Sequence, residues 1–386
     1  MNTAVIVDAV RTPLGKRNGV LKDWHPADLA AETLTAIAER NSLDPALVDD
    51  VIMGCVSQVG EQTYNIGRNA ALGAGWPESV PGVTLDRQCG SSQQAAHFAA
   101  QGVMAGVYDV AVASGVESMT RVPMGSSFST GPGKPFGDKM RARYHDSLVP
   151  QGISAEIIAE KWDIERDELD QISYDSHMRA AAAVQEGRFD AQIIPIEVRD
   201  NGGSTAVTLD EGIRPTTTME ALGALKPAFQ EDGKVTAGNS SQITDGAASI
   251  LIMSESKAND LGLTPKARFV SFSVVGTDPV SMLTGPIPAT EQALARAGLG
   301  IDDIGLFEIN EAFASVIGAW LRESGADWTN VNVNGGAIAL GHPLGASGAR
   351  LMTSLVHEME RSGTRYGLQA MCEGGGTANG TIIELL

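Results

Sequence analysis

The sequence predicts an α/β protein built from two similar halves. Short apolar runs that suit buried strands alternate with runs that suit helices, which is typical of βαβ units and a mainly parallel sheet. The order of these runs in the first 120 residues recurs after residue 267, which indicates an internal duplication. The chain has 386 residues, of which 43% are hydrophobic and only 19% charged. That length is too great for one ordinary core, so we expect at least two packed units.

The first 120 residues predict strands and helices in alternation. The helix expected at residues 26–41 is amphipathic, with Leu29, Thr33 and Ile37 on one face. Another helix is expected after Ser92, where small apolar residues suit a buried position. A third, shorter helix is expected at residues 67–73. The predicted strands cover residues 4–8, 48–56, 82–85 and 109–114.

A segment of different composition follows, from residue 119 to about residue 240. It contains loops rich in Gly, Ser and Pro, and two predicted helices within residues 154–186. We expect an inserted domain here and not a continuation of the sheet. Its basic residues form a candidate site for an anionic ligand, although each of them is also an ordinary surface charge when taken alone. These residues are Lys134, Lys139, Arg141, Arg143 and, further on, Arg214.

The second half repeats the predicted order of the first. Residues 244–253 predict a helix entered through an Asp-Gly-Ala-Ala turn, and a strand follows at residues 267–275. We therefore divide the chain into an N-terminal half (1–120 and 244–266), an inserted domain (121–243) and a C-terminal half (267–386). Active sites in such architectures form at strand C-termini, where the units meet. The elements that parallel the first half are a helix at 286–298, a strand at 303–308, a strand, Gly-rich turn and helix at 331–350, and a strand at 368–371.

Charge and cysteine content exclude several classes of function. The formal net charge of −19 repels nucleic acid and anionic membranes, so we expect neither as a partner. No apolar run reaches the roughly 20 residues that span a bilayer, and the N-terminus lacks the pattern of a signal peptide. The three cysteines, Cys55, Cys89 and Cys372, are too few and too scattered for a disulfide framework. These features predict a soluble cytoplasmic protein, in which Cys55 is a core residue.

Cys89 is a candidate nucleophile because it lies at a strand-to-helix turn. Free backbone N–H groups and the helix dipole favour an anion there, so we expect a lowered thiol pKa. Ser91 and Ser92 are plausible caps of the helix that follows. The alternative is a buried structural cysteine, since free Cys is among the most buried residue types.

Three further positions are candidates for the chemistry. His342 lies between Gly and Pro in the turn that the duplication makes equivalent to the Cys89 turn, so a pseudo-twofold packing brings an imidazole next to the thiol. Cys372 ends a predicted strand before three glycines, where a thiol can move a proton to or from carbon. Asn310 and Glu311 follow another strand and act either as helix caps or in catalysis. We expect no metal site, because the cysteines and His342 lack metal-ligand spacing.

Together these motifs resemble the thiolases. They are RQCGSSQQA around Cys89, NEAFA at residues 310–314, NVNGGAIALGHPLGASG at residues 332–348 and CEGGG at residues 372–376. The resemblance covers the whole chain. It implies a thiolase fold of five layers, αβαβα, made from two duplicated halves with an inserted loop domain, and a homodimer or homotetramer.

The resemblance also implies a role for each matching residue. Cys89 matches the nucleophile that becomes acylated, and His342 matches the histidine that activates it. Cys372 matches the acid/base that exchanges a proton with the α-carbon of acetyl-CoA. Asn310 matches the residue that positions a water and, with His342, forms an oxyanion hole for the thioester enolate. The backbone N–H groups of Cys89 and Gly374 match a second oxyanion hole.

The implied activity is that of an acetyl-CoA C-acyltransferase, a 3-ketoacyl-CoA thiolase. It would cleave a 3-ketoacyl-CoA with CoA to acetyl-CoA and a shortened acyl-CoA in a ping-pong cycle. CoA is then a substrate, and no cofactor is implied. Ser241 and Arg214 match positions near the pantetheine arm and the nucleotide end of CoA. The alternatives are a biosynthetic acetoacetyl-CoA thiolase, a condensing ketoacyl synthase, which typically lacks the second cysteine, and a non-catalytic acyl-CoA or lipid carrier on the same fold.

Two departures from the common family pattern bear on the substrate. Many thiolases carry a His-x-x-Met-Gly element beside the acyl thioester, where this chain has Gln151 in the Met position. The ending CEGGGTANG also differs from the common CxGGGQG form. The RQCGSSQQ and CEGGG variants resemble thiolases of actinobacterial lipid and steroid catabolism. We therefore expect a role in β-oxidation on a bulky or ring-derived acyl group.

Overall fold

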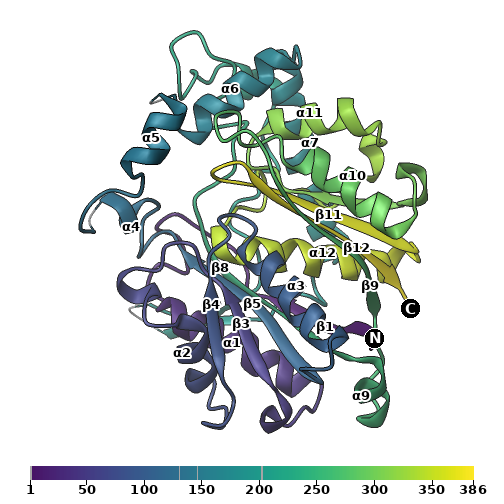
Figure 1. Ribbon diagram of the computed structural model, residues 1–386. Helices are drawn as coiled ribbons and strands as arrows, with labels where there is room; N and C mark the ends of the chain where they lie inside the picture. Colours follow the sequence, from purple (N-terminus) through teal and green to yellow (C-terminus); the bar gives the residue numbers. More distant parts are fainter. Residues whose placement is uncertain (1, 130, 146, 201–202) are drawn as a thin grey trace.

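The computed structural model describes residues 2–129, 131–145, 147–200 and 203–386 (Figure 1). Its main sheet runs in the order β10, β11, β12, β9, β1, β8, β5, β3, β4, and the short β2 pairs with β8. The strands of this sheet are β1 (Ala4–Arg11), β2 (Gly15–Lys16), β3 (Asp50–Gly54), β4 (Gly82–Leu85), β5 (Val110–Ser118), β8 (Thr244–Ser254), β9 (Ala267–Gly276), β10 (Leu306–Ile309), β11 (Tyr366–Glu373) and β12 (Thr377–Leu385).

The sheet consists of two halves with the same topology, which confirms the predicted duplication. In the N-terminal half, β3 and β5 are parallel, and β8 and then β1 follow with antiparallel pairing. In the C-terminal half, β10 and β11 are parallel, and β12 and then β9 follow with antiparallel pairing. The halves join where β1 pairs with β9 through Val5 opposite Arg268 and Ile6 opposite Ala267.

The helices complete five layers, as predicted. One face of the N-terminal half is covered by α1, against which α2 packs, and the outer face of the C-terminal half is covered by α10, against which α11 packs. Helices α3 and α12 contact each other between the two halves, and α12 touches strands of both (Figure 1). These helices are α1 (Pro26–Arg40), α2 (Ile66–Gly73), α3 (Ser91–Met104), α10 (Pro286–Ala297), α11 (Ala314–Ser324) and α12 (Ser347–Ser362).

Small residues allow this central layer to be thin. Helix α3 buries Ala95, Ala96, Ala99 and Ala100 in the same core cluster as Ala349 of α12. Side chains this short let two helices and two sheet halves pack closely without voids. Among the described residues, no helix is long and apolar enough to cross a membrane.

The prediction of a helix at residues 244–253 is wrong, because this segment forms β8. All eleven residues of β8 are buried, with β1 on one side and β5 on the other. A strand that is covered on both faces loses the apolar–polar alternation that identifies strands, so a run of small apolar residues suits either element.

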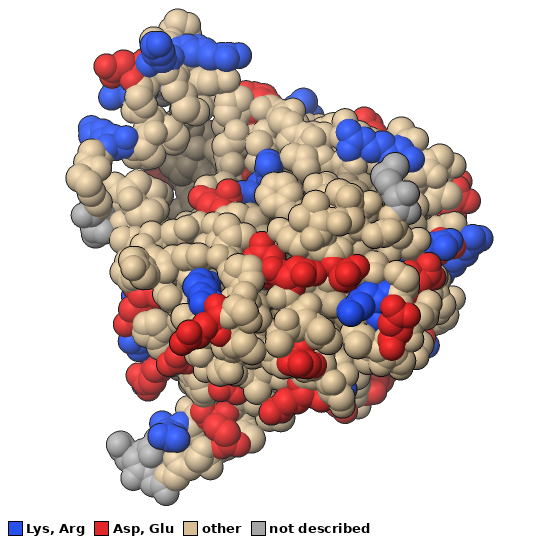
Figure 2. Space-filling model, turned by 60° about the horizontal axis from the view of Figure 1, so that its bottom comes forward, with Lys and Arg blue, Asp and Glu red and all other residues tan. Residues whose placement is uncertain are grey.

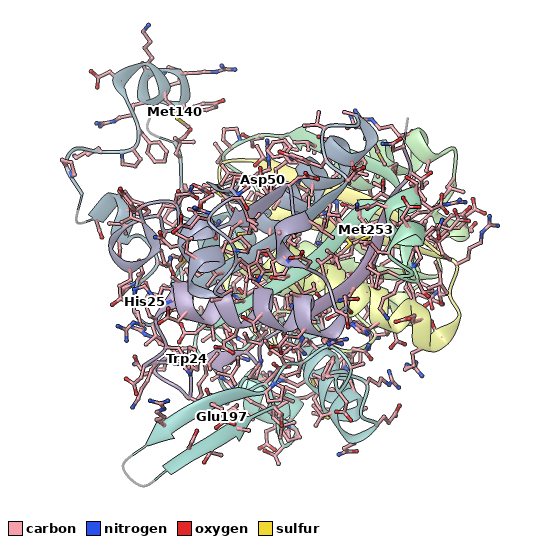
Figure 3. The ribbon with its side chains drawn as sticks, turned by 90° about the horizontal axis from the view of Figure 1, so that it is seen from below. Trp24, His25, Asp50, Met140, Glu197 and Met253 are labelled. Carbon is pink, nitrogen blue, oxygen red and sulfur yellow. The ribbon has the colours of Figure 1, made fainter. Side chains whose placement is uncertain are left out.

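The segment between β5 and β8 lies outside the main sheet. Its strands β6 (Ile196–Asp200) and β7 (Gly203–Val207) form a separate two-stranded sheet, which carries Glu197 below α1 in Figure 3. An arm that contains α4 and α5 projects from the body and carries Met140 at its tip (Figure 3), and Lys and Arg side chains gather on it (Figure 2). The helices of this segment are α4 (Ser126–Ser129), α5 (Asp138–Tyr144), α6 (Gln151–Lys161), α7 (Arg166–Gln185) and α8 (Met219–Gly223), and the short α9 (Glu255–Asp260) follows β8.

Candidate active site

Cys89 lies in a tight turn between β4 and α3. The residue before it, Gln88, has a left-handed backbone with φ of +48°, which is uncommon for a non-glycine residue. Gly90 is the N-cap of α3 and makes no side-chain cap, so the expected capping by Ser91 is wrong. Instead, the Ser91 hydroxyl donates to the Gln88 carbonyl at 2.5 Å and accepts from the Arg87 N–H at 2.9 Å. The serine thus holds the strained turn that presents Cys89.

The second expected cap, Ser92, connects the two central helices. Its hydroxyl accepts a hydrogen bond of 2.8 Å from the backbone N–H of Ala349 in α12. The prediction of a capping role for Ser92 is therefore also wrong, because the hydroxyl is directed to the other half of the molecule.

Burial has the largest effect on the pKa of the Cys89 thiol. The side chain is almost fully buried, and this burial, followed by the nearby Cys372 and Glu373, raises the thiol pKa well above its ordinary value. The backbone N–H groups of Gly374 and of Cys89 itself hydrogen-bond the sulfur and lower the pKa, but by less. The expected lowered pKa is wrong for this state of the protein, because loss of water around the thiol outweighs the N–H groups at the helix start. Cys89 is therefore a neutral thiol that needs a base.

The His342 turn of the C-terminal half lies against the strand ends of the N-terminal half. Gly341 enters the turn with φ of +113°, and the His342 N–H donates to the Thr244 hydroxyl at 3.0 Å. A Cβ on Gly345 would lie 2.6 Å from the backbone of Cys55, and one on Gly115 would lie 2.3 Å from the Gly345 carbonyl oxygen. Only glycines allow backbones to approach so closely.

A buried carboxylate stabilises the contact between the His342 turn and the N-terminal half. The sequence analysis did not indicate it. Glu117, the penultimate residue of β5, accepts hydrogen bonds from the N–H groups of Val56, Ser57 and Gly345 at 2.9–3.0 Å, and from the Gln62 amide at 2.7 Å. It therefore joins the His342 turn to the N-terminal half.

The hydrogen bonds of His342 determine which ring nitrogen is free. Its Nδ1 lies 2.5 Å from the Ser347 hydroxyl, and that hydroxyl donates its hydrogen to the Pro343 carbonyl at 2.8 Å. Ser347 must therefore accept from Nδ1–H, which leaves Nε2 as the acceptor. Burial, followed by Arg350, lowers the pKa of His342 to about 3. The ring is thus a neutral imidazole whose basic nitrogen is Nε2.

Asn310 lies between His342 and the second cysteine. Its Nδ2 is 3.5 Å from His342 Nε2, and its side chain also hydrogen-bonds the Cys372 thiol. Cys372 is fully buried, and this burial, followed by Glu373, raises its thiol pKa to about 12. The cap alternative for Asn310 and its neighbour Glu311 is wrong, because α11 begins only at Ala314 and has no side-chain cap.

Glu311 has a structural role. It accepts hydrogen bonds from the Ser176 hydroxyl at 2.7 Å, the Asn332 amide at 2.9 Å and the Ile338 N–H at 3.1 Å. These bonds join α7 of the inserted segment to the loop that leads to His342.

Comparison with known proteins now identifies the family. Family models described as "Thiolase, N-terminal domain" and "Thiolase, C-terminal domain" match residues 4–256 and 263–385. The chain belongs to the thiolase family. Its fold is similar to the crystal structure of the Bacillus anthracis acetyl-CoA acetyltransferase, with a TM-score of 0.92 and 40% identity over 100% of this chain and 99% of that one.

Two relatives are similar over the full length. A "Steroid 3-ketoacyl-CoA thiolase FadA6" of Mycobacterium tuberculosis is 50% identical, over 100% of this chain and 95% of that protein. A "3-ketoacyl-CoA thiolase" of Aliivibrio fischeri is 45% identical, over 100% of both chains.

The remaining expected residues of this thiolase-family chain lie at different distances from the thiols. Gln151, at the start of α6, has its Nε2 only 3.0 Å from where a Cβ on Gly374 would lie, which places it at the site. The Ser241 N–H donates to the Ala312 carbonyl, beside the Asn310 segment. Arg214 is exposed, and its N–H donates to His177 Nδ1 at 3.2 Å, so it lies on the inserted segment.

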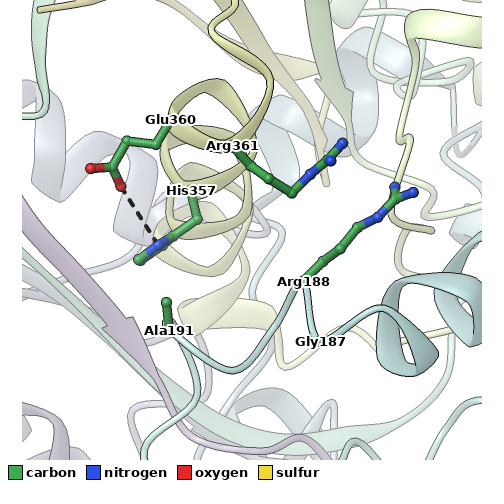
Figure 4. Close-up of a pocket in the computed structure, with 6 residues that line it drawn as sticks. All are labelled: Gly187, Arg188, Ala191, His357, Glu360 and Arg361. Carbon is green, nitrogen blue, oxygen red and sulfur yellow. Dashed lines mark ion pairs between the residues drawn. The ribbon is translucent and has the colours of Figure 1, made fainter.

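A surface pocket of about 370 Å³ lies elsewhere, between the end of α7 and α12 (Figure 4). Its cations are already engaged with carboxylates: Arg188 with Glu186 at 2.6 Å and Arg361 with Glu358 at 2.6 Å. His357 lies 3.9 Å from Glu360, and burial lowers the pKa of this histidine. We assign no function to this pocket. It is lined by Gly187, Arg188, Ala191, His357, Glu360 and Arg361.

Proposed function

We propose that this protein is a 3-ketoacyl-CoA thiolase that works through an acyl-Cys89 intermediate. The observation that carries the proposal is the convergence of two buried thiols, Cys89 and Cys372, with Asn310 and the neutral imidazole of His342. The names of the two relatives support the same activity. CoA acts as a substrate in this cycle, and no cofactor takes part.

The first half-reaction forms the acyl-enzyme. The Cys89 sulfur attacks the ketone carbon while His342 Nε2 takes the thiol proton. Because the N–H groups of Gly374 and Cys89 already hydrogen-bond this sulfur, they also lie near the oxygen that becomes negative after attack. One such donor is typically worth about 3–4 kcal/mol in the transition state.

Carbon–carbon cleavage then releases an acetyl-CoA enolate. Asn310 Nδ2 and the protonated His342 Nε2 lie 3.5 Å apart and would donate to the enolate oxygen together. Cys372 gives its proton to the enolate carbon, and acetyl-CoA leaves. In the second half-reaction, the Cys372 thiolate takes the proton of the incoming CoA thiol, CoA attacks acyl-Cys89, and His342 returns a proton to the Cys89 sulfur. Each group ends as it began.

We assign CoA binding to the inserted segment 121–243, between an N-terminal half (1–120 and 244–266) and a C-terminal half (267–386). Pairing of β8 with β1 and β5 supports this division. Arg214 and the exposed basic residues of the arm offer charge for the CoA phosphates in a chain of net charge −19. Ser241 would contact the pantetheine arm, and Gln151 the acyl group.

We further propose a homodimer, alone or paired into a tetramer, in the cytoplasm. Strand β4 forms one end of the main sheet, and none of the described strands pairs with its outer edge. Val83 on this strand is 44% exposed, and Phe98 of α3 is 46% exposed. An unpaired strand edge with apolar neighbours is a template for a second copy. Light scattering of the wild type against Val83→Lys tests this, because the substitution should shift the mass toward the monomer.

Intact-protein mass spectrometry tests the activity. The protein is mixed with a panel of 3-ketoacyl-CoAs and acyl-CoAs, beside Cys89→Ala as the control. An adduct of acyl mass on the wild type alone, removed by added CoA, is the expected result. If no thioester loads the wild type although CoA still binds, the thiolase proposal fails and the non-catalytic carrier replaces it.

The same panel addresses the acyl group and the direction. We propose a bulky or ring-derived acyl chain, supported by the 50% identical relative named a steroid thiolase. The expected order is then faster loading from ring-bearing 3-ketoacyl-CoAs than from linear ones of equal carbon number. Efficient formation of acetoacetyl-CoA from acetyl-CoA alone would favour the biosynthetic alternative instead.

A further inference from the structure

A buried carboxyl group lies beside the two thiols and has no part in the mechanism above. Glu373 stands between Cys372 and Gly374 in the chain and is fully buried. It faces Thr377 across the Gly-rich turn of the β11–β12 hairpin, and the Thr377 hydroxyl donates to its Oε2 at 2.5 Å. Its other oxygen, Oε1, is buried without a hydrogen-bond donor among the described residues.

This unpartnered oxygen fills the space at the start of α3. A Cβ on Gly90 would lie 1.9 Å from Glu373 Oε1 and 2.4 Å from Asn379 Oδ1. The two oxygens are therefore close neighbours, and Asn379 Oδ1 is also buried with no donor in the described part of the chain. The amide nitrogen of Asn379 is directed away, to Gln94 Oε1 at 3.2 Å.

Two buried acceptor oxygens that lie beside the same point in space repel each other unless a proton lies between them. A neutral carboxylic acid at Glu373 would supply that proton and would donate it to Asn379 Oδ1. Burial supports the neutral form, because it raises the pKa of Glu373 to about 8. Arg87 lowers this pKa and Asp86 raises it, but both effects are smaller than that of burial.

The titratable and charged neighbours of Glu373 come from three elements. Cys372 precedes it in the hairpin, Asp86, Arg87 and Cys89 belong to the β4–α3 turn, and His97 of α3 lies near Asn379. Burial lowers the pKa of His97 to about 3, so it is uncharged. A carboxylate at Glu373 would therefore place negative charge next to both thiols and oppose thiolate formation.

We propose that Glu373 is a positioning residue for the nucleophile, a neutral acid that anchors the Gly374 N–H beside Cys89 and leaves the thiol free to take the negative charge. This inference rests on Cys89 being the nucleophile. It predicts that ionisation of Glu373 above neutral pH makes Cys89 harder to ionise.

The test is the pH dependence of Cys89 alkylation by iodoacetamide in the substrate-free protein, located by peptide mass spectrometry. Glu373→Gln keeps the shape and can donate to Asn379, but it cannot ionise. We expect the ratio of the Glu373→Gln rate to the wild-type rate to rise about tenfold between pH 7 and pH 10, which is the effect of one pKa unit on the thiolate population. Asp50→Asn, which removes a half-buried carboxyl where β3 begins, should leave the ratio to wild type constant.

A constant ratio for Glu373→Gln would overturn the proposal, and so would a ratio that falls as the pH rises. If Glu373→Gln does not fold, the infrared difference spectrum between pH 7 and pH 10 is recorded in Glu308→Gln, because burial also raises the pKa of Glu308 to about 8. A neutral acid at Glu373 then still loses its protonated-carboxyl band over this range. A spectrum without that band would also overturn it. Alkylation needs no thioester, so failure of acyl loading would refute the thiolase proposal separately.

Discussion

The turn that carries Cys89 and the turn that carries His342 occupy equivalent places in the two halves. Each follows a segment paired with an outer strand of the main sheet, β3 in the first half and β10 in the second. Each enters a buried helix that begins with a serine, Ser91 in α3 and Ser347 in α12. They differ in length and in pairing. In the N-terminal half, the segment before the turn is strand β4, and helix α3 begins six residues after its end. In the C-terminal half, the corresponding segment forms only a single bridge, between Phe307 and Val331.

The difference shows how a duplicated scaffold yields two chemistries. The short N-terminal turn is strained at Gln88 and directs a thiol at the helix start. The long C-terminal turn crosses to the other half, where Glu117 holds the N–H of Gly345. A longer loop can bring the backbone of His342 against Thr244 of the other half, which a tight turn cannot do.

The largest effect should come from removing either chemical group. Cys89→Ala and His342→Ala should each lower kcat at least about a thousandfold, and the double variant should be little worse than either alone, because the two groups act as one unit. Steady-state thiolysis of the best substrate measures this. Effects that multiply in the double variant would show that the two turns act independently.

The two serines that begin the helices should differ in their effect on the reaction. Ser347→Ala removes the acceptor for His342 Nδ1–H and should lower kcat about 10- to 100-fold, as loss of an orienting partner typically does. Ser91→Ala removes hydrogen bonds within the turn and should cost about 1 kcal/mol in the free energy of unfolding. The pH profile of kcat should move only in Ser347→Ala. An equal change in both variants would mean that Ser347 is merely structural.

The contact between the halves should be sensitive to a single methyl group. Gly345→Ala places a Cβ 2.6 Å from the Cys55 backbone, and such overpacking should lower the free energy of unfolding by about 1–3 kcal/mol. Gly223→Ala, in open space at the end of α8, is the matched control and should change little. Urea unfolding compares the two. Equal midpoints would mean that the halves are not held at this contact.

The smallest effect concerns pH. His97 of α3 is the buried histidine of the N-terminal half, and burial lowers its pKa from 6.5 to about 3. A lowered folded-state pKa gives stability that is complete above pH 6.5 and is lost as the pH falls toward 3. The wild type should therefore lose up to about 1.4 kcal/mol more per pH unit than His97→Gln between pH 6 and pH 4, measured by urea unfolding. Parallel curves for the two proteins would contradict this.

Most of the fold was accessible from the sequence because local periodicity and the repeated order agree. The expectation of a mainly parallel sheet was wrong, because β8, β1, β9 and β12 all pair antiparallel with their neighbours. The helix at Pro26–Arg40 has an amphipathic face, and the strand at Ala267–Gly276 lies between clear turn signals. Strand β8 was missed because helices α1 on one face, and α3 and α12 on the other, bury both of its faces, and these helices come from distant parts of the chain. Hydrophobic periodicity is a local signal, so it does not show which distant segments cover a strand or a helix.

Only part of the active site could be predicted from the sequence, again because some of its contacts come from distant parts of the chain. The sequence indicated Cys89, His342, Asn310 and Cys372 through their turns and motifs, and the structure brings Asn310 into contact with His342 and Cys372. The thiol pKa was predicted with the wrong sign, because burial of Cys89 depends on packing between the halves. Glu117 gave no local signal, since its partners lie up to 228 residues away. Ser347, five residues after His342, was readable in principle as a nearby hydroxyl at the start of the next helix.

The fixed ring of His342 has a consequence for the bookkeeping of protons. Nδ1 is permanently occupied by the Ser347–Pro343 relay, so a proton that enters at Nε2 has no exit through the far side of the ring. The imidazole therefore does not conduct protons from one side to the other. A proton that it accepts at Nε2 must leave again from Nε2. The protons used in the reaction therefore do not exchange with solvent through the Nδ1 side of His342. Deuterium taken from a labelled Cys89 thiol should return to the same sulfur before it reaches bulk water.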